Sequence, residues 1–146
     1  MPTGGKLAGA ILFGLLGWYL AGIMAPLFPD DSAPDYLIPT GAGLGVVLGW
    51  RMCGARAGQG YNNIPAIGLT YAVAQVFWLC FVVGVVTMVN NAMRGRFGGP
   101  MEAALSTFSN LFDVAVYFAD INFIIALIIG SLLAAVGTEY VAQRFP

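Results

Sequence analysis

Residues 40–50 read TGAGLGVVLGW, and the spacing of their glycines decides between two different folds. A dinucleotide-binding turn has the form GxGxxG, lies between a strand and a helix, and has an acidic residue about 20 positions further on. Gly41, Gly43 and Gly45 give GxGxG instead, no β-rich run precedes them, and no carboxylate follows before Glu102. The stretch therefore does not predict a nucleotide site.

The same stretch has a second spacing, because Gly41, Gly45 and Gly49 lie four residues apart and share one helix face. Small residues at this spacing let two helices approach closely in lipid. Matching strips occur at Ala126, Gly130, Ala134 and Thr138, and at Ala10 and Gly14. We expect Gly41, Gly45, Gly49, Gly130 and Ala134 to be helix-packing residues within one bundle, with a homodimer seam as the alternative.

The composition outside this stretch also indicates a membrane protein. The chain is 59% hydrophobic and only 9% charged, against roughly 25% charged residues in soluble domains. Four stretches carry no charge, at 7–29, 36–50, 57–93 and 121–138, and a membrane-spanning helix needs about 20 mostly apolar residues. We predict an all-α membrane protein with one domain, 1–146. Its four transmembrane helices are expected at about 7–28, 38–53, 65–91 and 121–140.

An additional helix is predicted between the third and fourth spans, at about 100–119. Pro100 and Glu102 suit a helix N-terminus. Polar residues recur every three or four positions, and the opposite face is apolar. Because three carboxylates in lipid are costly, this helix is predicted to be amphipathic and interfacial rather than a fifth span. It is expected to lie along the membrane surface or to pack against the bundle.

The basic residues predict the orientation. With four spans and a cytoplasmic N-terminus, the cytoplasmic side holds Lys6, Arg51, Arg56 and Arg144, and the other side holds Arg94 and Arg96. The excess of Lys and Arg favours both termini in the cytoplasm. The lipid bilayer is the expected environment, and no nucleic-acid partner is expected.

Few residues suggest chemistry. The chain has no histidine, so the commonest general base and the commonest metal ligand are both missing. We expect no enzyme activity, catalytic residue, cofactor or metal site. The carboxylates lie in a loop or near the ends of spans and are interpreted as solvated charges. Asp120 with Asn122, at the start of the last span, is either a helix cap or a cation site.

The loop GARAGQGYNN, at 54–63, is the best candidate for an oxyanion site. Its backbone N–H groups, with Arg51 and Arg56, form a candidate oxyanion-attracting site. The alternative is a flexible turn on the positive side of the membrane. Cys53, beside these arginines, is the candidate reactive thiol, whereas Cys80, within the third span, is interpreted as a small core residue.

Several segments together resemble one protein family. LGWRMCGARAGQG (48–60), FWLCF (77–81) and RGRFGGPMEAAL (94–105), with the opening MPT and PLFPDD, resemble the TrgA-type tellurite-resistance membrane proteins of alphaproteobacteria. The resemblance is spread over most of the chain. It implies a multi-pass protein of the bacterial cytoplasmic (inner) membrane that is associated with tellurite resistance, and it carries over no catalytic or binding residue.

Two functions follow as hypotheses. One is a TrgA-like protein that acts on the entry, export or detoxification of an oxyanion, with Arg51, Arg56, Arg94 and Arg96 attracting the anion and Cys53 as its thiol. The other is an accessory or structural subunit that packs against a larger membrane protein complex, and a homo-oligomer is a further alternative. No carboxylate lies in mid-span, which argues against an autonomous proton-coupled pump.

Overall fold

The structure, a computed structural model, describes residues 4–28, 33–95 and 98–145, and every regular element in these ranges is helical. The long helices are α1 (Gly4–Met24), α2 (Leu37–Leu48), α4 (Ile64–Met93), α5 (Pro100–Tyr117) and α6 (Ile121–Arg144). Of these, α1, α4 and α6 are long and apolar enough to cross a membrane. The prediction of an all-α chain is confirmed for the described residues, and three of its helices have the length and composition of membrane spans.

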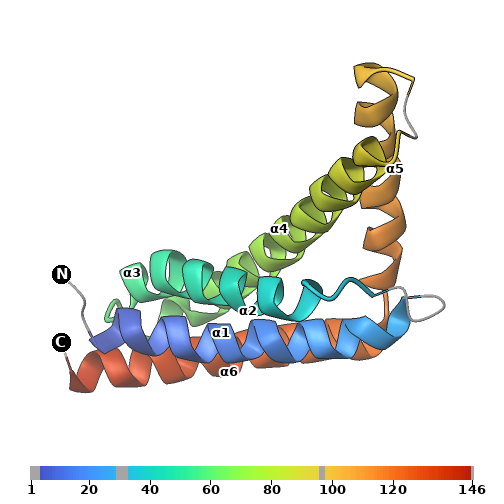
Figure 1. Ribbon diagram of the computed structural model, residues 1–146. Coiled ribbons are helices and arrows are strands. Elements are labelled where there is room, and N and C mark those ends of the chain that lie inside the picture. The colour runs from blue at the N-terminus through green and yellow to red at the C-terminus, as the bar shows by residue number, and fades with distance from the viewer. Residues whose placement is uncertain (1–3, 29–32, 96–97, 146) are drawn as a thin grey trace.

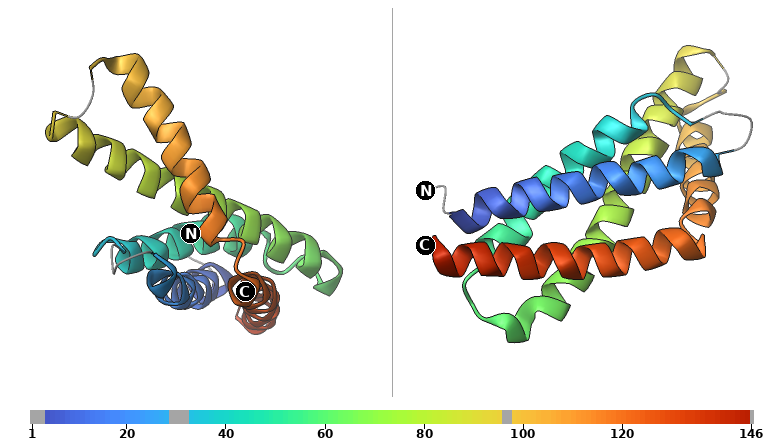
Figure 2. Two further views of the ribbon diagram at one scale, coloured as in Figure 1. Left: turned by 90° about the vertical axis from the view of Figure 1, so that its right-hand side faces the viewer. Right: turned by 90° about the horizontal axis from the view of Figure 1, so that it is seen from below.

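Helices α1, α2 and α6 form a bundle with the first half of α4, and the rest of α4 forms a protruding arm with α5 (Figure 1). Helix α1 lies between α2 and α6, which both run antiparallel to it, so the N- and C-termini lie at one end of the bundle. Helix α4 starts at that end, leaves the bundle at an angle, and pairs with α5. Seen along the bundle from the end opposite the termini, α1 runs toward the viewer and α6 away, and α5 projects sideways from this near end (Figure 2).

Glycines hold α1 and α2 almost in backbone contact. A Cβ added at Gly41 would lie 2.7 Å from the carbonyl oxygen of Gly17, and one at Gly45 would fall on the carbonyl of Phe13. Gly49 lies in the same way against Gly9. All three glycines of the four-residue spacing therefore lie at this interface, within one chain. The facing positions on α1 are Gly9, Phe13 and Gly17 rather than Ala10, and Gly14 touches the side chain of Val46.

A π-helical turn, Gly49–Cys53, adds a fourth glycine, Gly54, to this contact between α1 and the chain that follows α2. In an α-helix, residues five apart lie on different faces, but a π-turn has i→i+5 hydrogen bonds and brings them onto the same side. Gly54 consequently follows Gly49 on the face toward α1, where an added Cβ would lie 2.5 Å from the Cα of Lys6. The chain is helical from Leu37 through α3 (Gly54–Arg56).

The contact between α1 and α6 uses side chains rather than backbones. Leu16 of α1 fills the space above Gly130, and Leu12 fills the space above Gly137. Ala134 is buried between these two glycines in a cluster with Phe13 and Tyr71. Gly130 and Ala134 thus lie at a helix contact, although the glycine accepts a leucine instead of a second backbone.

A small polar cluster crosses the apolar core. The Gln75 side chain on α4 donates to the carbonyl oxygen of Gly41 at 3.1 Å, and the Tyr71 hydroxyl lies 3.2 Å from both the Phe13 carbonyl and the Gln75 side-chain oxygen. Among the described residues, no buried side-chain nitrogen or oxygen lacks a hydrogen-bond partner. These hydrogen bonds fix α4 against both α1 and α2.

Helix α5 has three faces. One face packs against α4 near Gly84, through Thr107 and Leu111. A second is exposed and apolar, and consists of Met101, Leu105, Phe108, Phe112 and Val116. A third carries the exposed carboxylates Glu102 and Asp113. The helix is therefore amphipathic and packs against α4.

Candidate functional site

The loop that follows α3 binds an anion, and the anion belongs to the chain itself. The backbone N–H of Gly58 donates to Oε2 of Glu139 at 2.7 Å, and the N–H of Gly60 donates to Oε1 at 2.9 Å. The Gln143 side chain donates to the same Oε1 at 3.1 Å. Glu139 is only 3% exposed, so the interpretation of this carboxylate as a solvated charge is wrong.

The glycines of the loop are required by its backbone shape. Gly58 and Gly60 have φ angles of 91° and 99°, which residues with a Cβ rarely adopt. These angles turn two N–H groups toward the same carboxylate, and this geometry is a known way to bind anions. Because Glu139 already accepts from both N–H groups, they are not available to an external oxyanion in this conformation.

The arginines proposed to attract an oxyanion do not form one cluster. Arg51 in the π-turn and Arg56 at the end of α3 are both exposed, and neither pairs with a carboxylate among the described residues. Arg94 follows the last residue of α4, about 45 Å along that 30-residue helix from its start. Arg96 lies outside the described residues. Among the described arginines of this set, Arg51 and Arg56 therefore precede α4, and Arg94 lies at its other end.

Cys53 does not have the surroundings of a reactive thiol. Its side chain is only 2% exposed, whereas reactive cysteines are partly exposed. It lines a cavity of about 10 Å³ with Ala57, Thr138 and Glu139. The burial of Cys53 in the π-turn therefore argues against the candidate reactive thiol. Cys80 is also buried and unpaired.

Asp120 is a helix cap. Its Oδ1 accepts from the backbone N–H groups of Asn122 at 2.9 Å and Phe123 at 3.2 Å, at the first turn of α6. This is the usual role of an aspartate at that position. Among the described residues, no group of three or more metal-ligating side chains occurs. Of the two interpretations of Asp120, a helix cap or a cation site, the structure shows the helix cap.

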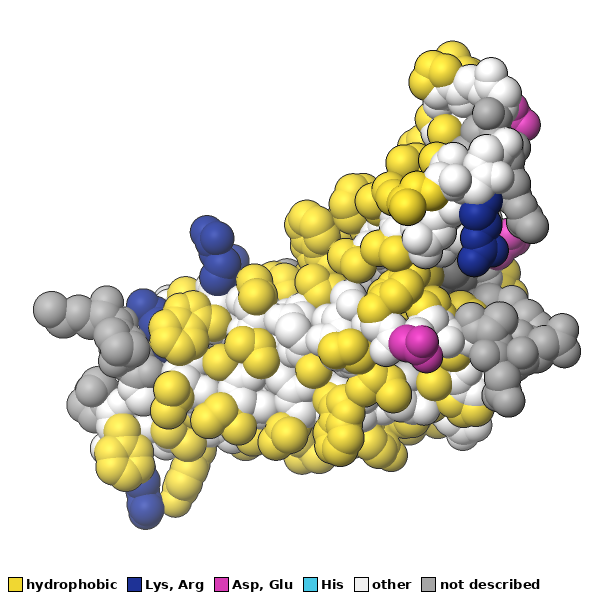
Figure 3. Space-filling view, in the orientation of Figure 1, with side chains coloured by type: hydrophobic (Ala, Val, Ile, Leu, Met, Phe, Trp, Pro, Cys, Tyr) yellow, Lys and Arg dark blue, Asp and Glu magenta, His cyan; other side chains and the backbone are white. Residues whose placement is uncertain are grey.

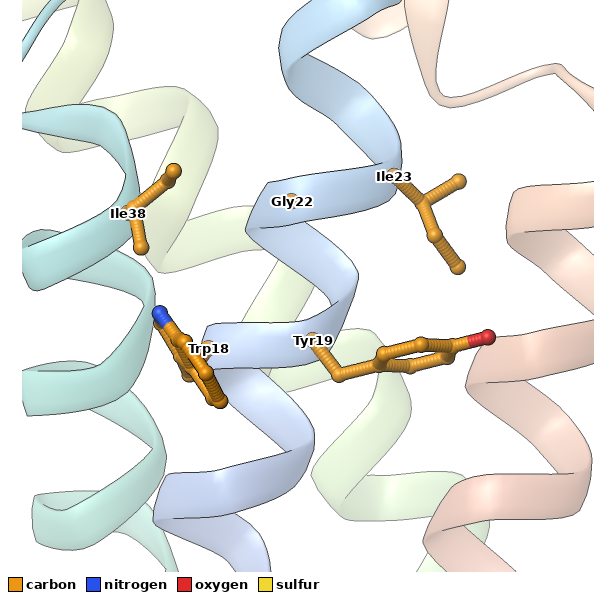
Figure 4. A pocket seen from close by; sticks show the side chains of 5 residues that line it. All are labelled: Trp18, Tyr19, Gly22, Ile23 and Ile38. Atoms are coloured by element: carbon orange, nitrogen blue, oxygen red, sulfur yellow. The ribbon is translucent and has the colours of Figure 1, made fainter.

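The outer surface carries apolar grooves. One, of about 340 Å³, lies between α1 and α2 and is lined by Trp18, Tyr19, Gly22, Ile23 and Ile38 (Figure 4). A second, of about 480 Å³, follows α4 beside Leu69, Val73 and Phe77. A third, of about 380 Å³, lies between α2 and α4 and includes Arg51 and Trp78. Hydrophobic side chains cover most of the visible face (Figure 3).

Three aromatic rings form a patch on α4. The ring centres of Phe77 and Trp78 are 5.8 Å apart, and those of Trp78 and Phe81 are 5.7 Å apart, both in edge-to-face geometry. Phe77 and Phe81 are stacked at 6.3 Å. All three side chains are exposed, and Trp78 also lines the groove between α2 and α4. We call Phe77, Trp78 and Phe81 the aromatic patch.

Charge is distributed unequally along the molecule. In the space-filling view, most basic side chains lie toward the end with both termini, whereas the visible acidic side chains, with one further basic side chain, lie toward the other end and on the arm (Figure 3). Lys6, Arg51, Arg56 and Arg144 belong to helix ends at the terminal end of the bundle. Arg144 also lies over the Tyr140 ring, 5.1 Å from its centre.

Comparisons of the chain with protein-family models, with curated proteins and with solved structures found no match. The resemblance to TrgA-type proteins therefore stays a prediction from the sequence segments that carry it.

Two features of the site have only weak signals in the sequence. The sequence predicts that backbone N–H groups of the loop 54–63 can bind an anion, but the carboxylate that Gly58 and Gly60 bind, Glu139, lies 79 to 81 residues away. Gly54 lies five residues after Gly49, which does not fit an α-helical face. A step from four-residue to five-residue glycine spacing is the signal that indicates a π-turn.

Proposed function

We propose that this chain is a bacterial inner-membrane protein that supports tellurite tolerance, as its resemblance to TrgA-type proteins implies, and that it acts by packing beside another membrane protein. The observation that carries the packing role is the aromatic patch. Its residues lie 13 to 17 positions after the start of α4, or about 20–25 Å along the helix. This depth is far from the interfaces where tryptophan usually anchors a span.

A preformed aromatic surface suits a partner helix. Aromatic side chains supply much of the binding energy at protein interfaces, and fixed rings lose little conformational entropy on binding. Leu69 and Val73 extend the patch toward the start of α4 as exposed side chains. The proposed partner is a transmembrane helix of a larger complex, and a second copy of this chain is the alternative that the experiment below distinguishes.

The proposed membrane arrangement has four spans. Besides α1, α4 and α6, the fourth is the continuous helical run from Leu37 to Arg56, whose 20 residues measure about 30 Å. Helix α5 is proposed to lie in the interface opposite the termini, because it projects sideways from that end of the bundle (Figure 2) and has both an apolar and an acidic face. The basic terminal end then faces the cytoplasm.

Replacing Val73 by tryptophan tests the packing role. Val73 is 65% exposed, so we expect the fold to survive while a bulky ring disturbs the partner surface. The native mass of the complex, extracted from its own membranes in mild detergent, should fall to that of the free protein, and tellurite tolerance should fall with it. Ile129→Trp on α6, where Ile129 is 53% exposed, is the matched control and should change neither property.

The outcomes of this experiment separate the alternatives. A wild-type mass equal to a small multiple of this chain indicates a homo-oligomer in place of a larger complex. A wild-type protein that migrates alone contradicts the packing role altogether. The packing role is also contradicted if the Val73→Trp variant keeps the native mass of the wild-type complex and the wild-type tellurite tolerance.

Direct handling of an oxyanion is the second candidate function, because Arg51 and Arg56 are exposed without carboxylate partners among the described residues. If this function is correct, Arg51→Gln with Arg56→Gln lowers tellurite tolerance at least severalfold at unchanged protein abundance. If the packing role alone is correct, tolerance stays within about twofold, since both side chains lie outside the aromatic patch. Minimal inhibitory concentrations, normalised to abundance by immunoblot, measure this difference.

A further inference from the structure

The groove between α2 and α4 combines an apolar wall with one charge. It has a volume of about 380 Å³ and is lined by Leu44, Val47, Leu48, Arg51, Met52 and Trp78. Leu44, Val47 and Leu48 lie on one face of α2, and this face continues into the π-turn that holds Arg51. The apolar wall therefore extends about 10 Å along the helix and ends at a guanidinium.

The position of Arg51 matches the place of a lipid headgroup. Arg51 is exposed and has no carboxylate partner among the described residues. It lies toward the basic terminal end of the bundle, whereas Trp78 reaches the same groove from the middle of α4. A guanidinium binds phosphate through paired hydrogen bonds, and anionic lipids attract arginine at a membrane surface.

We propose that this groove binds one anionic phospholipid, with its phosphate at Arg51 and its acyl chains against Val47, Leu48 and Trp78. The two other surface grooves provide the comparison. The groove between α1 and α2 and the groove beside Leu69 are lined by apolar, tyrosine, threonine and glycine residues without a charge, so they match acyl chains but provide no charged group for a phosphate. This site shares Trp78 with the aromatic patch, but Arg51 and Val47, the residues that the test changes, lie outside that patch.

The test measures thermal stability of the purified full chain in mild detergent, with added phosphatidylglycerol or phosphatidylcholine of identical acyl chains. We expect the wild-type melting temperature to rise more with phosphatidylglycerol. Arg51→Gln should bind that lipid about fivefold more weakly, the loss expected for one arginine near anionic lipid. Arg56→Gln removes an equally exposed arginine outside the groove lining and should keep the wild-type response.

A second variant tests the groove rather than the charge. Val47→Trp fills the apolar wall while keeping Arg51, and mass spectrometry should then detect less co-purified anionic phospholipid than with wild type. Retention of the wild-type amount in this variant would overturn the site. The site would also be overturned if both lipids raised the melting temperature equally, or if Arg51→Gln and Arg56→Gln weakened lipid binding equally. A full rise in melting temperature with inorganic phosphate alone would overturn it too, and would indicate a small-anion site.

Discussion

Replacing Gly45 by alanine is expected to lower the melting temperature of the purified protein by roughly 4–8 °C, which corresponds to about 2 kcal/mol for a chain of this size. The added Cβ falls on the Phe13 carbonyl, and backbone cannot yield as the end of a side chain can. Overpacking of this kind costs about 1–3 kcal/mol or more. Gly45→Leu is expected to prevent accumulation of folded protein.

Gly43 is the matched control in the same helix. A Cβ at Gly43 meets nothing within 4 Å, and alanine is favoured over glycine in a helix by about 1 kcal/mol. Gly43→Ala should therefore leave the melting temperature unchanged or raise it. If Gly45→Ala and Gly43→Ala have the same melting temperature, the close contact of α1 with α2 does not contribute to stability. The packing described for Gly41, Gly45 and Gly49 is then wrong.

Glu139→Gln is expected to destabilise the protein about as much as Gly45→Ala does, by roughly 2 kcal/mol. A hydrogen bond to a charged group contributes about 1.5–3 kcal/mol. Glutamine keeps only one acceptor oxygen, so its NH2 group must face one of the two loop N–H groups. Hydrogen exchange should show the result directly, as faster exchange of the Gly58 and Gly60 amides together with a lower melting temperature.

Glu102→Gln is the control for this substitution. The Glu102 carboxylate also accepts a glycine N–H, that of Gly98 at 2.8 Å, but this hydrogen bond is exposed to solvent. We expect its loss to cost less than about 1 kcal/mol, because water replaces the missing acceptor. If Glu102→Gln and Glu139→Gln lowered the stability equally, burial of the Glu139 carboxylate would not determine how much it contributes to stability.

The sequence predicts those features that depend on neighbouring residues. Uncharged runs predict the long helices, whose bounds agree with Gly4–Met24, Ile64–Met93 and Ile121–Arg144 within a few residues. The four-residue glycine spacing predicts close packing along one face of α2, and Gly41, Gly45 and Gly49 each lie against α1. Both predictions need only helical periodicity and the cost of charge in lipid.

The remaining features depend on contacts between distant parts of the chain. Nothing near Glu139 in the sequence indicates that its carboxylate is buried, because the amides that stabilise it come from Gly58 and Gly60. The inward position of Cys53 depends on a π-turn that changes the helical register after Gly49. The neighbouring charges of Arg51 and Arg56 predict a reactive thiol. Proximity in the sequence, however, does not show which way the Cys53 side chain points.

The bond between Glu139 and the glycine loop also has a consequence for biosynthesis. The loop at Gly58 and Gly60 is synthesised well before α6, so its two N–H groups have no carboxylate partner until Glu139 has left the ribosome and α6 has packed beside α1. A nascent chain stalled before α6 would lack the acceptor for both N–H groups. Completion of the last helix closes that loop, and closure distinguishes the finished protein from its precursors.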